Sequence, residues 1–391
     1  MALFVIDVTG SATDVGIVLA ANAIPLVGLL LVGGVWADRL PRHRVIVVTD
    51  LVRFALHALL AGLILSGAVA IWHVVVIEVL FGAAEAFYRP AASGLVPQTV
   101  PEGEIQDANA LSTTSDNVAE FVGPALATAL VLGLSAGTAF ALDAASFLVS
   151  AACVARVRPR RRAVAVEATA PPGMWNEVRA GFREVRSRAW IWATLLAFCV
   201  AVFAAFAPWA VLGPSVAREQ YGGIGVFGIV SAAFGAGTIA GALLGLGWRP
   251  RYPMRMAMAF AVLWPLSTVL YALGVTLFLV VPATVVAGAG IALFDVWWLT
   301  ALAERLPPDK LSRVTAYDWL VSLALLPLGY LLAGPLAGAL GAVTVLLGGS
   351  ILAFLALALG LLPRETRDLE RIDDEDASTP VPEHRPGLPV A

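Results

Sequence analysis

Charged residues are scarce in this chain: only 14% of its 391 residues are Asp, Glu, Lys or Arg, and Lys310 is the only lysine. Soluble globular domains contain about 25% charged residues. Cysteine is also rare, and the two that are present, Cys153 and Cys199, lie inside apolar runs. This count excludes a disulfide framework and a cysteine metal site. A soluble enzyme is excluded as well, and we expect neither a cofactor nor a metal.

Apolar residues, in contrast, make up 59% of the chain. A helix crosses a bilayer core of about 30 Å with about 20 apolar residues. Alternating strand patterns are absent from the sequence, and helices satisfy their own backbone groups in lipid. The sequence therefore predicts an all-α, polytopic membrane protein. Its eleven complete spans are expected at residues 15–35, 45–66, 71–92, 108–133, 137–156, 189–212, 225–247, 256–274, 277–300, 313–335 and 341–362.

The first six residues are apolar and look like the last turns of a further helix. A signal peptide is the alternative, but this segment has no basic n-region and its apolar stretch is short. We therefore expect a twelve-helix protein whose first helix is mostly missing from this chain.

Basic residues gather in alternate loops, and cytoplasmic loops carry the excess of Lys and Arg. The basic set is Arg39, Arg42, Arg44, Arg156, Arg158, Arg160, Arg161, Arg162, Arg249, Arg251, Arg255, Arg305, Lys310 and Arg313. The opposite loops carry only Arg218. We expect a multi-pass protein of the cell membrane with a cytoplasmic C-terminus. The tail after Leu362 contributes −4 and the rest of the chain +1 to the net charge of −3, so the charge balance indicates no nucleic-acid partner.

Four pairs of residues are separated by the same 211 positions: Gly34 and Gly245, Arg44 and Arg255, Gly123 and Gly334, and Pro124 and Pro335. A constant offset indicates two parallel copies of a six-helix unit, a repeat from which transporters are built. We expect an N-terminal bundle over residues 1–156 and a C-terminal bundle over 189–362. A cytoplasmic linker with an amphipathic helix (Trp175, Val178, Phe182 and Val185 on one face) is expected over 157–188, and a disordered acidic tail over 363–391.

The loop between the first two complete spans reads Gly34-Val-Trp-Ala-Asp38-Arg39-Leu-Pro-Arg42-His43-Arg44. It resembles the signature loop of the major facilitator superfamily, with Pro41 at the place of the usual second glycine. Gly34 would let helices approach closely, and Asp38 would accept hydrogen bonds from the N-terminus of a helix capped by Ser312. The resemblance implies a conformational latch formed by Gly34, Asp38, Arg39, Arg42 and Arg44. A merely topogenic basic loop is the alternative.

A second motif, Gly123-Pro124, lies inside a span and has its counterpart in Gly334-Pro335. It resembles the Gly-Pro helix motif of the proton-coupled exporters of the same superfamily, where proline bends the helix. An ordinary kink is the alternative. Because the motif occurs at the same position in both repeats, its placement favours a feature of the repeat over a feature that only exporters have. The stretch from Asp295 to Gly338, with Phe87–Ala91 and the run 100–111, resembles the branch that contains the enterobactin exporter and related drug-efflux proteins.

Ionisable side chains inside spans are costly in lipid and are often functional. Glu85, Asp116 and Glu120 are the candidates for proton coupling, because Asp116 and Glu120 are four residues apart and share a helix face. An acid that pairs with Arg89 or Arg53 and only holds helices together is the alternative.

The other polar residues in the spans are expected to have mainly structural or gating roles. Asp295 and Asp318 are candidates for an inner gate. Asp50 and Arg53 are expected to form an intrahelical or latch-network pair, His57 to be a satisfied interhelical histidine, and Asp143 to be structural. Most of the tryptophans at 209, 264, 297, 298 and 319 are assigned to the aromatic belt and the core, with stacking on an aromatic substrate as the alternative. The glycines at 235, 237, 241 and 245 are assigned to close helix packing rather than to a nucleotide-binding loop.

These observations favour a secondary transporter that works by alternating access in the lipid bilayer, as a monomer. The resemblance implies proton-coupled efflux of a small amphipathic organic compound that is drug-like or siderophore-like. The sequence has no ATP-binding signature, so the energy would come from an ion gradient. Ion-coupled uptake of a small solute is the alternative, and a membrane receptor or scaffold, or a membrane enzyme, are further ones.

Overall fold

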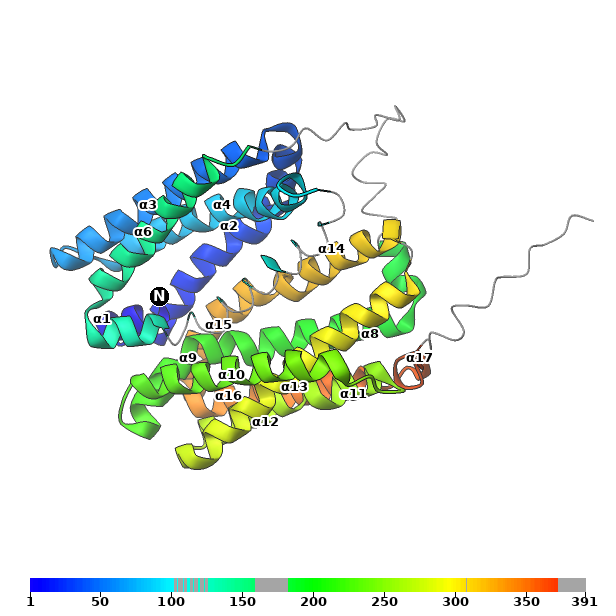
Figure 1. Cartoon of the computed structure of the whole chain (residues 1–391). Helices are drawn as coiled ribbons and strands as arrows, with labels where there is room; N and C mark the ends of the chain where they lie inside the picture. Colours follow the sequence, from blue (N-terminus) through cyan, green and yellow to red (C-terminus); the bar gives the residue numbers. More distant parts are fainter. Residues whose placement is uncertain are drawn as a thin grey trace, which may run out of the picture.

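The chain folds, in a computed structural model, into two groups of helices that lie side by side (Figure 1). The structure describes residues 1–101, 126–158, 182–306 and 308–371, together with the single positions 104, 108, 111, 112, 115, 119 and 123. The first group contains α1 (Ala2–Thr9), α2 (Ala12–Arg39), α3 (Arg42–Leu65), α4 (Ile71–Leu95) with the short η1 (Val96–Gln98), and α6 (Ala136–Val154).

The second group follows after residue 188. It contains α8 (Ala189–Ala201), the π-helical turn η3 (Val202–Phe206), α9 (Ala207–Tyr221), α10 (Gly225–Gly247), α11 (Pro253–Ala261), α12 (Leu263–Ala272), α13 (Leu277–Arg305), α14 (Pro308–Ala324), α15 (Leu326–Leu340), α16 (Ala342–Leu359) and α17 (Arg364–Arg367). In Figure 1 the helices α14 and α15 run between the first group and the rest of the second.

Ten helical segments within the described residues are long and apolar enough to cross a membrane. They match ten of the eleven spans that the sequence predicts. The remaining one, residues 108–133, lies largely outside the described residues. Several predicted spans are longer in the structure: the one expected at 189–212 covers Ala189–Tyr221 and consists of α8, η3 and α9.

The two groups repeat the same arrangement, as the constant offset predicts. Adding 211 to the bounds of α2 gives residues 223–250, and α10 covers Gly225–Gly247. The same shift places α3 on α11 and α12, α4 on α13, and α6 on α16. In each group the first of these helices packs mainly against the third, α2 against α4 and α10 against α13. The fold is therefore a pair of pseudo-symmetric bundles.

Small residues hold these helix pairs together. A Cβ atom at Gly237 or Gly241 of α10 would overlap a carbonyl oxygen of α13, so the expectation of close packing is confirmed for these two glycines, whereas Gly235 lines a cavity. In the first group, a Cβ at Gly33 of α2 would overlap the carbonyl oxygen of Ala86 in α4. Gly34 has no described atom within 4 Å of its Cβ position. Among the described residues the close approach lies at its neighbour Gly33, which the helix turns toward α4, and the close packing expected at Gly34 stays a prediction.

The molecule has two distinct ends. At one, the glycine end, five loops each contain a glycine with positive φ: Gly10, Gly67, Gly222, Gly274 and Gly341. Only glycine adopts this conformation without strain, which permits the tight reversals there. The opposite end, the arginine end, carries the basic loops and α17, and it lies on the right in Figure 1.

The two groups touch through α2 and α15 near the glycine end. A Cβ at Gly16 of α2 would overlap the carbonyl oxygen of Tyr330, and a Cβ at Gly334 of α15 would overlap the backbone of Thr13. Asp7 of α1 also pairs with Arg218 of α9, with 3.0 Å between the carboxylate and guanidinium groups. The groups are therefore in backbone contact at this end.

The beginning of the acidic tail is structured, although the sequence predicts disorder from residue 363. Thr366 is fully buried, and Glu365 accepts a hydrogen bond of 2.8 Å from the backbone N–H of Ala189, at the start of α8. Glu370 contacts Arg251 at 2.9 Å. These ionic and capping contacts hold the segment against the second group. Residues 372–391 lie outside the described residues.

Most of the expected amphipathic linker helix, with Trp175 and Val178, lies outside the described residues as well. Residues 182–187 are helical. Val185 is buried in a cluster with Trp190 and Leu306. This end of the linker therefore packs on the second group.

Candidate binding cavity and polar clusters

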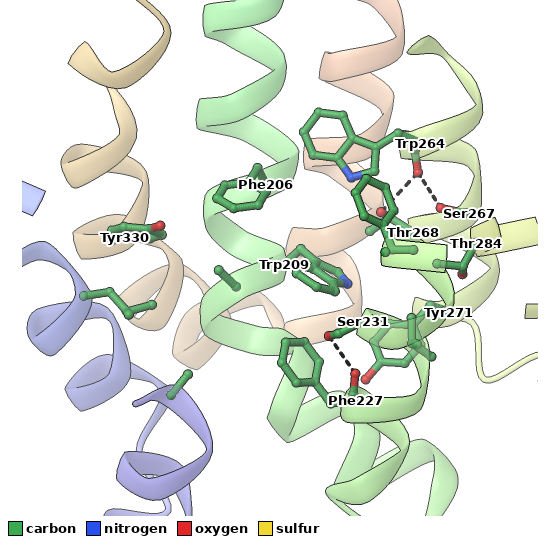
Figure 2. A pocket seen from close by; sticks show the side chains of 16 residues that line it. Phe206, Trp209, Phe227, Ser231, Trp264, Ser267, Thr268, Tyr271, Thr284 and Tyr330 are labelled. Carbon is green, nitrogen blue, oxygen red and sulfur yellow. Dashed lines mark hydrogen bonds between the residues drawn. The ribbon is translucent and has the colours of Figure 1, made fainter. Parts of the chain in front are cut away.

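A cavity of about 330 Å³ lies in the second group, on the side that faces α2 (Figure 2). Its walls come from η3, α9, α10, α12, α13 and α15, with Leu19 of α2 and Ala2 of α1 closing it from the first group. Trp209, Trp264 and Tyr330 lie in the middle thirds of their spans. The cavity is thus at middle depth, and its volume is within the range of about 300–1,000 Å³ that small-molecule sites have.

Aromatic rings form most of this wall. The ring centroids of Phe206 and Trp209 lie 6.3 Å apart, and those of Trp209 and Phe227 4.8 Å apart. Phe206 is also 6.2 Å from Trp264. Figure 2 shows these side chains around the cavity, with Tyr330 on the helix opposite Phe206. Such rings bind apolar and aromatic surfaces by stacking, and their faces attract cations.

The polar atoms of the wall are few, and most of its hydroxyl groups donate to backbone carbonyls. The hydroxyl of Ser231 donates to the carbonyl of Phe227 at 2.8 Å, and that of Thr284 to the carbonyl of Val280 at 2.8 Å. Tyr271 donates to the carbonyl of Gly213 at 2.6 Å. None of the described lining residues carries a formal charge. The cavity therefore suits a largely apolar ligand that is neutral or cationic.

Three helix irregularities border the cavity, and each has a proline just after it. The π-helical turn Val202–Phe206 precedes Pro208, the break between α11 and α12 precedes Pro265, and the break between α14 and α15 precedes Pro327. Proline has no N–H and its ring collides with the carbonyl four residues earlier, so it interrupts the helical ladder. These interruptions set the positions of Phe206, Trp264 and Tyr330 along the wall.

The sequence-based assignment of the tryptophans to the belt and the core holds for three of the described ones. Trp297 and Trp298 are core residues, each 3% exposed, and their ring N–H groups donate to the carbonyl of Trp248 and to Asp318. Trp209 and Trp264 line the cavity, the position that the sequence left as the alternative, and Trp264 is at the same time part of the buried core, at 8% exposed. A signal was present in the sequence, because both lie next to a proline inside a span. The side chain of Trp319 lies outside the described residues.

The residues of the expected latch are partly described. Arg42 donates to the carbonyl of Gly94 at 2.5 Å, at the end of α4, where the helix dipole favours a cation. Arg39 is exposed at the end of α2, and Arg44 lies in the first turn of α3. The side chain of Asp38 lies outside the described residues. Ser312 is not a helix cap, because α14 begins four residues earlier, at Pro308.

Of the three candidates for proton coupling, only Glu85 is described. It pairs with Arg89 one turn later, with 2.6 Å between the charged groups. This is one of the pairings that the sequence left open for it. Asp116 and Glu120 lie outside the described residues.

The motif Gly334-Pro335 lies inside α15, whose helical structure continues through both residues. This span also has a break in its helical structure, next to Pro327, about two turns before the motif. Gly334 serves the contact with Thr13 of α2. Gly123 is helical, and Pro124 lies outside the described residues.

The candidates for an inner gate lie on neighbouring helices. Asp318 of α14 accepts a hydrogen bond of 3.0 Å from the ring N–H of Trp298 in α13 and also bonds Ser322. Asp295 is exposed on α13 and also makes a polar interaction. The Asp318 contact joins two helices of the same group.

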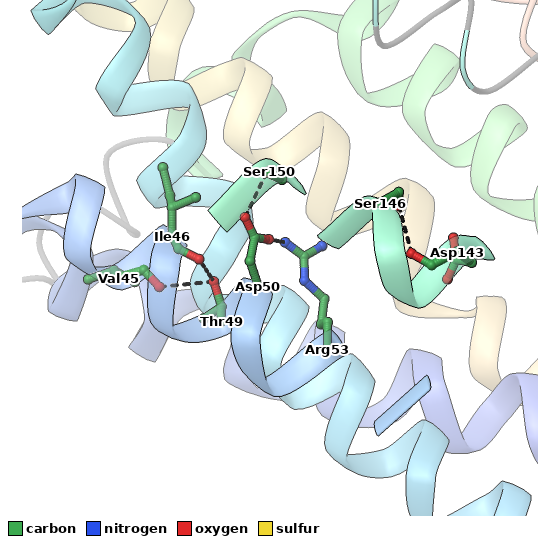
Figure 3. A network of polar contacts seen from close by, with 8 residues as sticks. All are labelled: Val45, Ile46, Thr49, Asp50, Arg53, Asp143, Ser146 and Ser150. Carbon is green, nitrogen blue, oxygen red and sulfur yellow. Dashed lines mark hydrogen bonds and ion pairs between the residues drawn. The ribbon is translucent and has the colours of Figure 1, made fainter. Parts of the chain in front are cut away.

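Asp50 and Arg53 form the intrahelical ion pair that the sequence predicts, buried inside the first group (Figure 3). Asp50 also accepts a hydrogen bond of 2.7 Å from Ser150 of α6. The guanidinium group of Arg53 lies 3.8 Å from the centroid of Tyr88 and 4.6 Å from that of Phe147. The pair therefore connects α3 with α4 and α6.

His57 is an interhelical histidine, as predicted, but only one of its two ring nitrogens is satisfied, because the buried Nε2 has no hydrogen-bond partner among the described residues. Its Nδ1 lies 2.5 Å from Oδ2 of Asp143 in α6. Its Nε2 lies 3.9 Å from Oε1 of Glu78 in α4, and Glu78 in turn accepts a hydrogen bond of 3.0 Å from Asn22 of α2. Four helices of the first group thus meet at one polar cluster.

The chain matches, over residues 1–387, the family described as transmembrane secretion effector. It is 22% identical over 373 residues to macrolide efflux protein A of Streptococcus pyogenes, covering 94% of this chain and 91% of that protein. It is 31% identical over 275 residues to an MFS-type transporter of Sinorhizobium fredii, covering 67% of this chain and 65% of the relative.

Solved transporter structures share the fold. A bacterial homologue of the human lysosomal transporter Spinster, in an inward-facing and unoccupied conformation, superposes with a TM-score of 0.71 at 15% identity, covering 95% of this chain and 94% of the other. The nucleoside transporter NupG gives a TM-score of 0.68 at 15% identity, with coverages of 92% and 93%. The arrangement of two six-helix bundles is therefore that of known transporters.

Proposed function

Because the chain belongs to the transmembrane secretion effector family of the major facilitator superfamily, and is therefore a multi-pass membrane transporter, we propose that it exports amphipathic organic compounds from the cell. The compounds carry an aromatic or other apolar part and are neutral or cationic. The observation that carries the proposal is the uncharged aromatic cavity at middle depth, lined by Trp209, Trp264 and Phe206. The efflux direction is supported by the name of the macrolide efflux relatives.

We propose that the arginine end faces the cytoplasm, together with α17, and that the glycine end faces outward. The loops at the arginine end carry many more Arg residues than the loops at the glycine end, and this difference supports the orientation. In that orientation the contacts of Gly16 and Gly334 close the outer side. The structure would then be an inward-facing state, ready to receive a compound from the cytoplasm or the inner leaflet.

Transport in this proposal is alternating access. The bundle over residues 1–156 and the bundle over 189–362 pivot around the cavity, in a bilayer and as a monomer, with a proton moving inward as the compound moves out. Since Leu19 of the first bundle and Tyr330 of the second both line the cavity, relative motion of the bundles opens and closes it. A ligand that binds one state better shifts the equilibrium between the states.

The test is efflux from cells that express the protein, with ethidium and the macrolide erythromycin as probes. Expression should lower the accumulation of at least one probe, and collapse of the proton gradient should restore it. Trp209→Ala removes a stacking ring and should weaken the apparent affinity roughly tenfold, since stacking and lost apolar area together are worth about 1–2 kcal/mol. Accumulation that is the same with and without the protein would contradict efflux of these classes.

Trp72→Ala is the matched control for this variant. Trp72 is 61% exposed at the start of α4 and does not line the cavity. The Trp72→Ala variant loses the same kind of side chain at a place outside the cavity, so its efflux should equal that of the wild type. Equal losses in both variants would show that the effect of Trp209→Ala is not specific to the cavity.

A further inference from the structure

Three titratable side chains of the first bundle form a continuous line: Asp143 of α6, His57 of α3 and Glu78 of α4. The imidazole ring lies between the two carboxyl groups, with Nδ1 2.5 Å from Asp143 and Nε2 3.9 Å from Glu78. The second oxygen of Glu78 accepts a hydrogen bond of 3.0 Å from Asn22 of α2. A histidine ring with a carboxyl group on each side is the arrangement that passes a proton from one carboxyl group to the other.

Access to this line decreases from one end to the other. The side chain of Asp143 is 47% exposed, whereas the side chains of His57 and Glu78 are each 9% exposed. Three rings enclose the imidazole, with centroid distances of 4.3 Å for Phe81, 5.5 Å for Phe140 and 5.9 Å for Phe147. Asp143 thus lies at the surface of the first group, whereas His57 and Glu78 lie inside it.

The buried Nε2 of His57 has no hydrogen-bond partner among the described residues. An unpaired buried polar atom is costly, so a packed core rarely keeps one without a function. A shift of about 1 Å would bring Nε2 within hydrogen-bond distance of Glu78. The two groups are therefore poised to exchange a proton after a small movement.

The other charged groups near Glu78 are known. The amino group of Met1 in front of α1 and the carboxyl group of Glu85 on α4 act on it electrostatically. One turn from His57 on α3 lies Arg53, which is paired with Asp50. Binding of one proton removes one negative charge from the carboxyl groups of this cluster, which lowers the cost of its burial in the bilayer.

The cluster is joined to the helix that moves between states. Asn22, the partner of Glu78, lies on α2. The same helix lines the cavity with Leu19 and contacts the other bundle through Gly16. The hydrogen bond from Asn22 is stronger when Glu78 is ionised and weaker when Glu78 is protonated. Proton binding therefore changes the strength of the contact between α4 and α2.

We propose that His57, Glu78 and Asp143 form the proton-binding site that couples the proton gradient to transport. The proposal rests on the proposed function. A proton enters at Asp143, is bound between His57 and Glu78, and leaves the same groups after the bundles have changed state. No other group is consumed or formed in this cycle.

The test uses the full chain, purified and reconstituted, with Glu78→Gln as the main variant. Glutamine has the same shape and keeps an acceptor for Asn22, but it binds no proton. Infrared difference spectra between alkaline and acidic buffer, without any transported compound, should show a carboxyl protonation band that is absent in Glu78→Gln. Ethidium efflux down its own gradient should continue, and the stimulation of efflux by an imposed pH gradient should be lost at least tenfold.

Two further variants sharpen the result. His57→Gln should also lose the gradient stimulation, because it breaks the line between the carboxyl groups. Glu219→Gln, which removes an exposed carboxyl group from α9, should behave as the wild type in every measurement. Glu85→Gln separates this site from the candidate on the same helix, and should keep the stimulation.

The proposal is overturned if Glu78→Gln keeps both the infrared band and the gradient stimulation. It is also overturned if the band is lost while the stimulation remains, since the cluster then only holds helices together. Failure of the proposed function has a different signature, because no probe is then transported by any variant, and the infrared band still reports whether Glu78 binds a proton.

Discussion

The carboxylate of Asp7 and the guanidinium group of Arg218 lie 3.0 Å apart, and the two residues are separated by 211 positions, the interval that relates the two repeats. Equivalent points of the two bundles thus face each other at the glycine end. The backbone contacts of Gly16 and Gly334 lie one to two turns deeper on α2 and α15. Polar contact at the rim and backbone contact beneath it together close this side.

Cross-linking of this pair should stop transport. In a chain with Cys153 and Cys199 replaced by alanine, Asp7→Cys and Arg218→Cys together should react with a short, reducible bifunctional thiol reagent. Ethidium efflux should fall to the background, because the glycine end can no longer open, and reductant should restore it. Efflux that continues after complete cross-linking would contradict an opening of this end during transport. Asp7→Cys alone, treated with the same reagent, is the control.

Arg218→Gln without cross-linking should have a small effect. Both side chains are about half exposed or more, and an exposed ion pair contributes about 0–1 kcal/mol. We expect the efflux rate to change by less than about fivefold, the factor that corresponds to 1 kcal/mol. A loss of much more than this would show that the pair has a role beyond closing the rim.

A larger effect is expected from Gly334→Val. Any Cβ at this position overlaps the backbone of Thr13, so α2 and α15 must separate near the glycine end. The state with a closed glycine end is destabilised, and the variant should lose efflux while the protein remains folded in detergent. Gly338→Val is the matched control, because position 338 on the same helix has no described atom within 4 Å. Size-exclusion profiles and efflux of both variants give the comparison.

Much of this fold follows from the sequence because the solvent of the spans is lipid. Apolar runs of about 20 residues are long-range signals that depend on no particular contact. The 211-residue offset likewise predicts that α2 and α10 occupy equivalent positions in the two repeats, and that α4 and α13 do so as well. Residue-level packing was less predictable, as Gly33 and Gly34 show. Neighbours on a helix differ by about 100° in direction, and only the partner helix decides which of them is in contact.

The cavity could not be predicted for a related reason. Trp209 and Trp297 both lie in apolar spans, and the proline beside Trp209 is a signal in the sequence that does not by itself place a ring in a cavity. The difference between cavity and core rings comes from the helix irregularities near Pro208 and Pro265, which set the depth and direction of the rings. His57 illustrates the opposite case, since a histidine in a span was expected to find a partner on another helix, and Asp143 is that partner.

The buried pair of Asp50 and Arg53 should matter for stability. Asp50→Asn leaves the guanidinium group buried without its counter-ion, which costs about 3–5 kcal/mol. We expect a clearly lower unfolding temperature in detergent. Arg89→Gln breaks the pair with Glu85, and Arg89 is about half exposed, so its effect should remain below about 1 kcal/mol. Equal unfolding temperatures of the two variants would contradict the role assigned to the buried pair.

The adjacent glycines of α2 provide a test within a single turn. Gly33→Ala places a methyl group onto the carbonyl oxygen of Ala86, which cannot move without shifting α4. Overpacking of this kind costs about 1–3 kcal/mol, so the unfolding temperature should fall. Gly34→Ala meets no described atom within 4 Å, and alanine is the better helix former by about 0.8–1.0 kcal/mol. Its unfolding temperature should therefore equal or exceed that of the wild type. The reverse order would show that Gly34, as the sequence motif suggests, is the position of close packing after all.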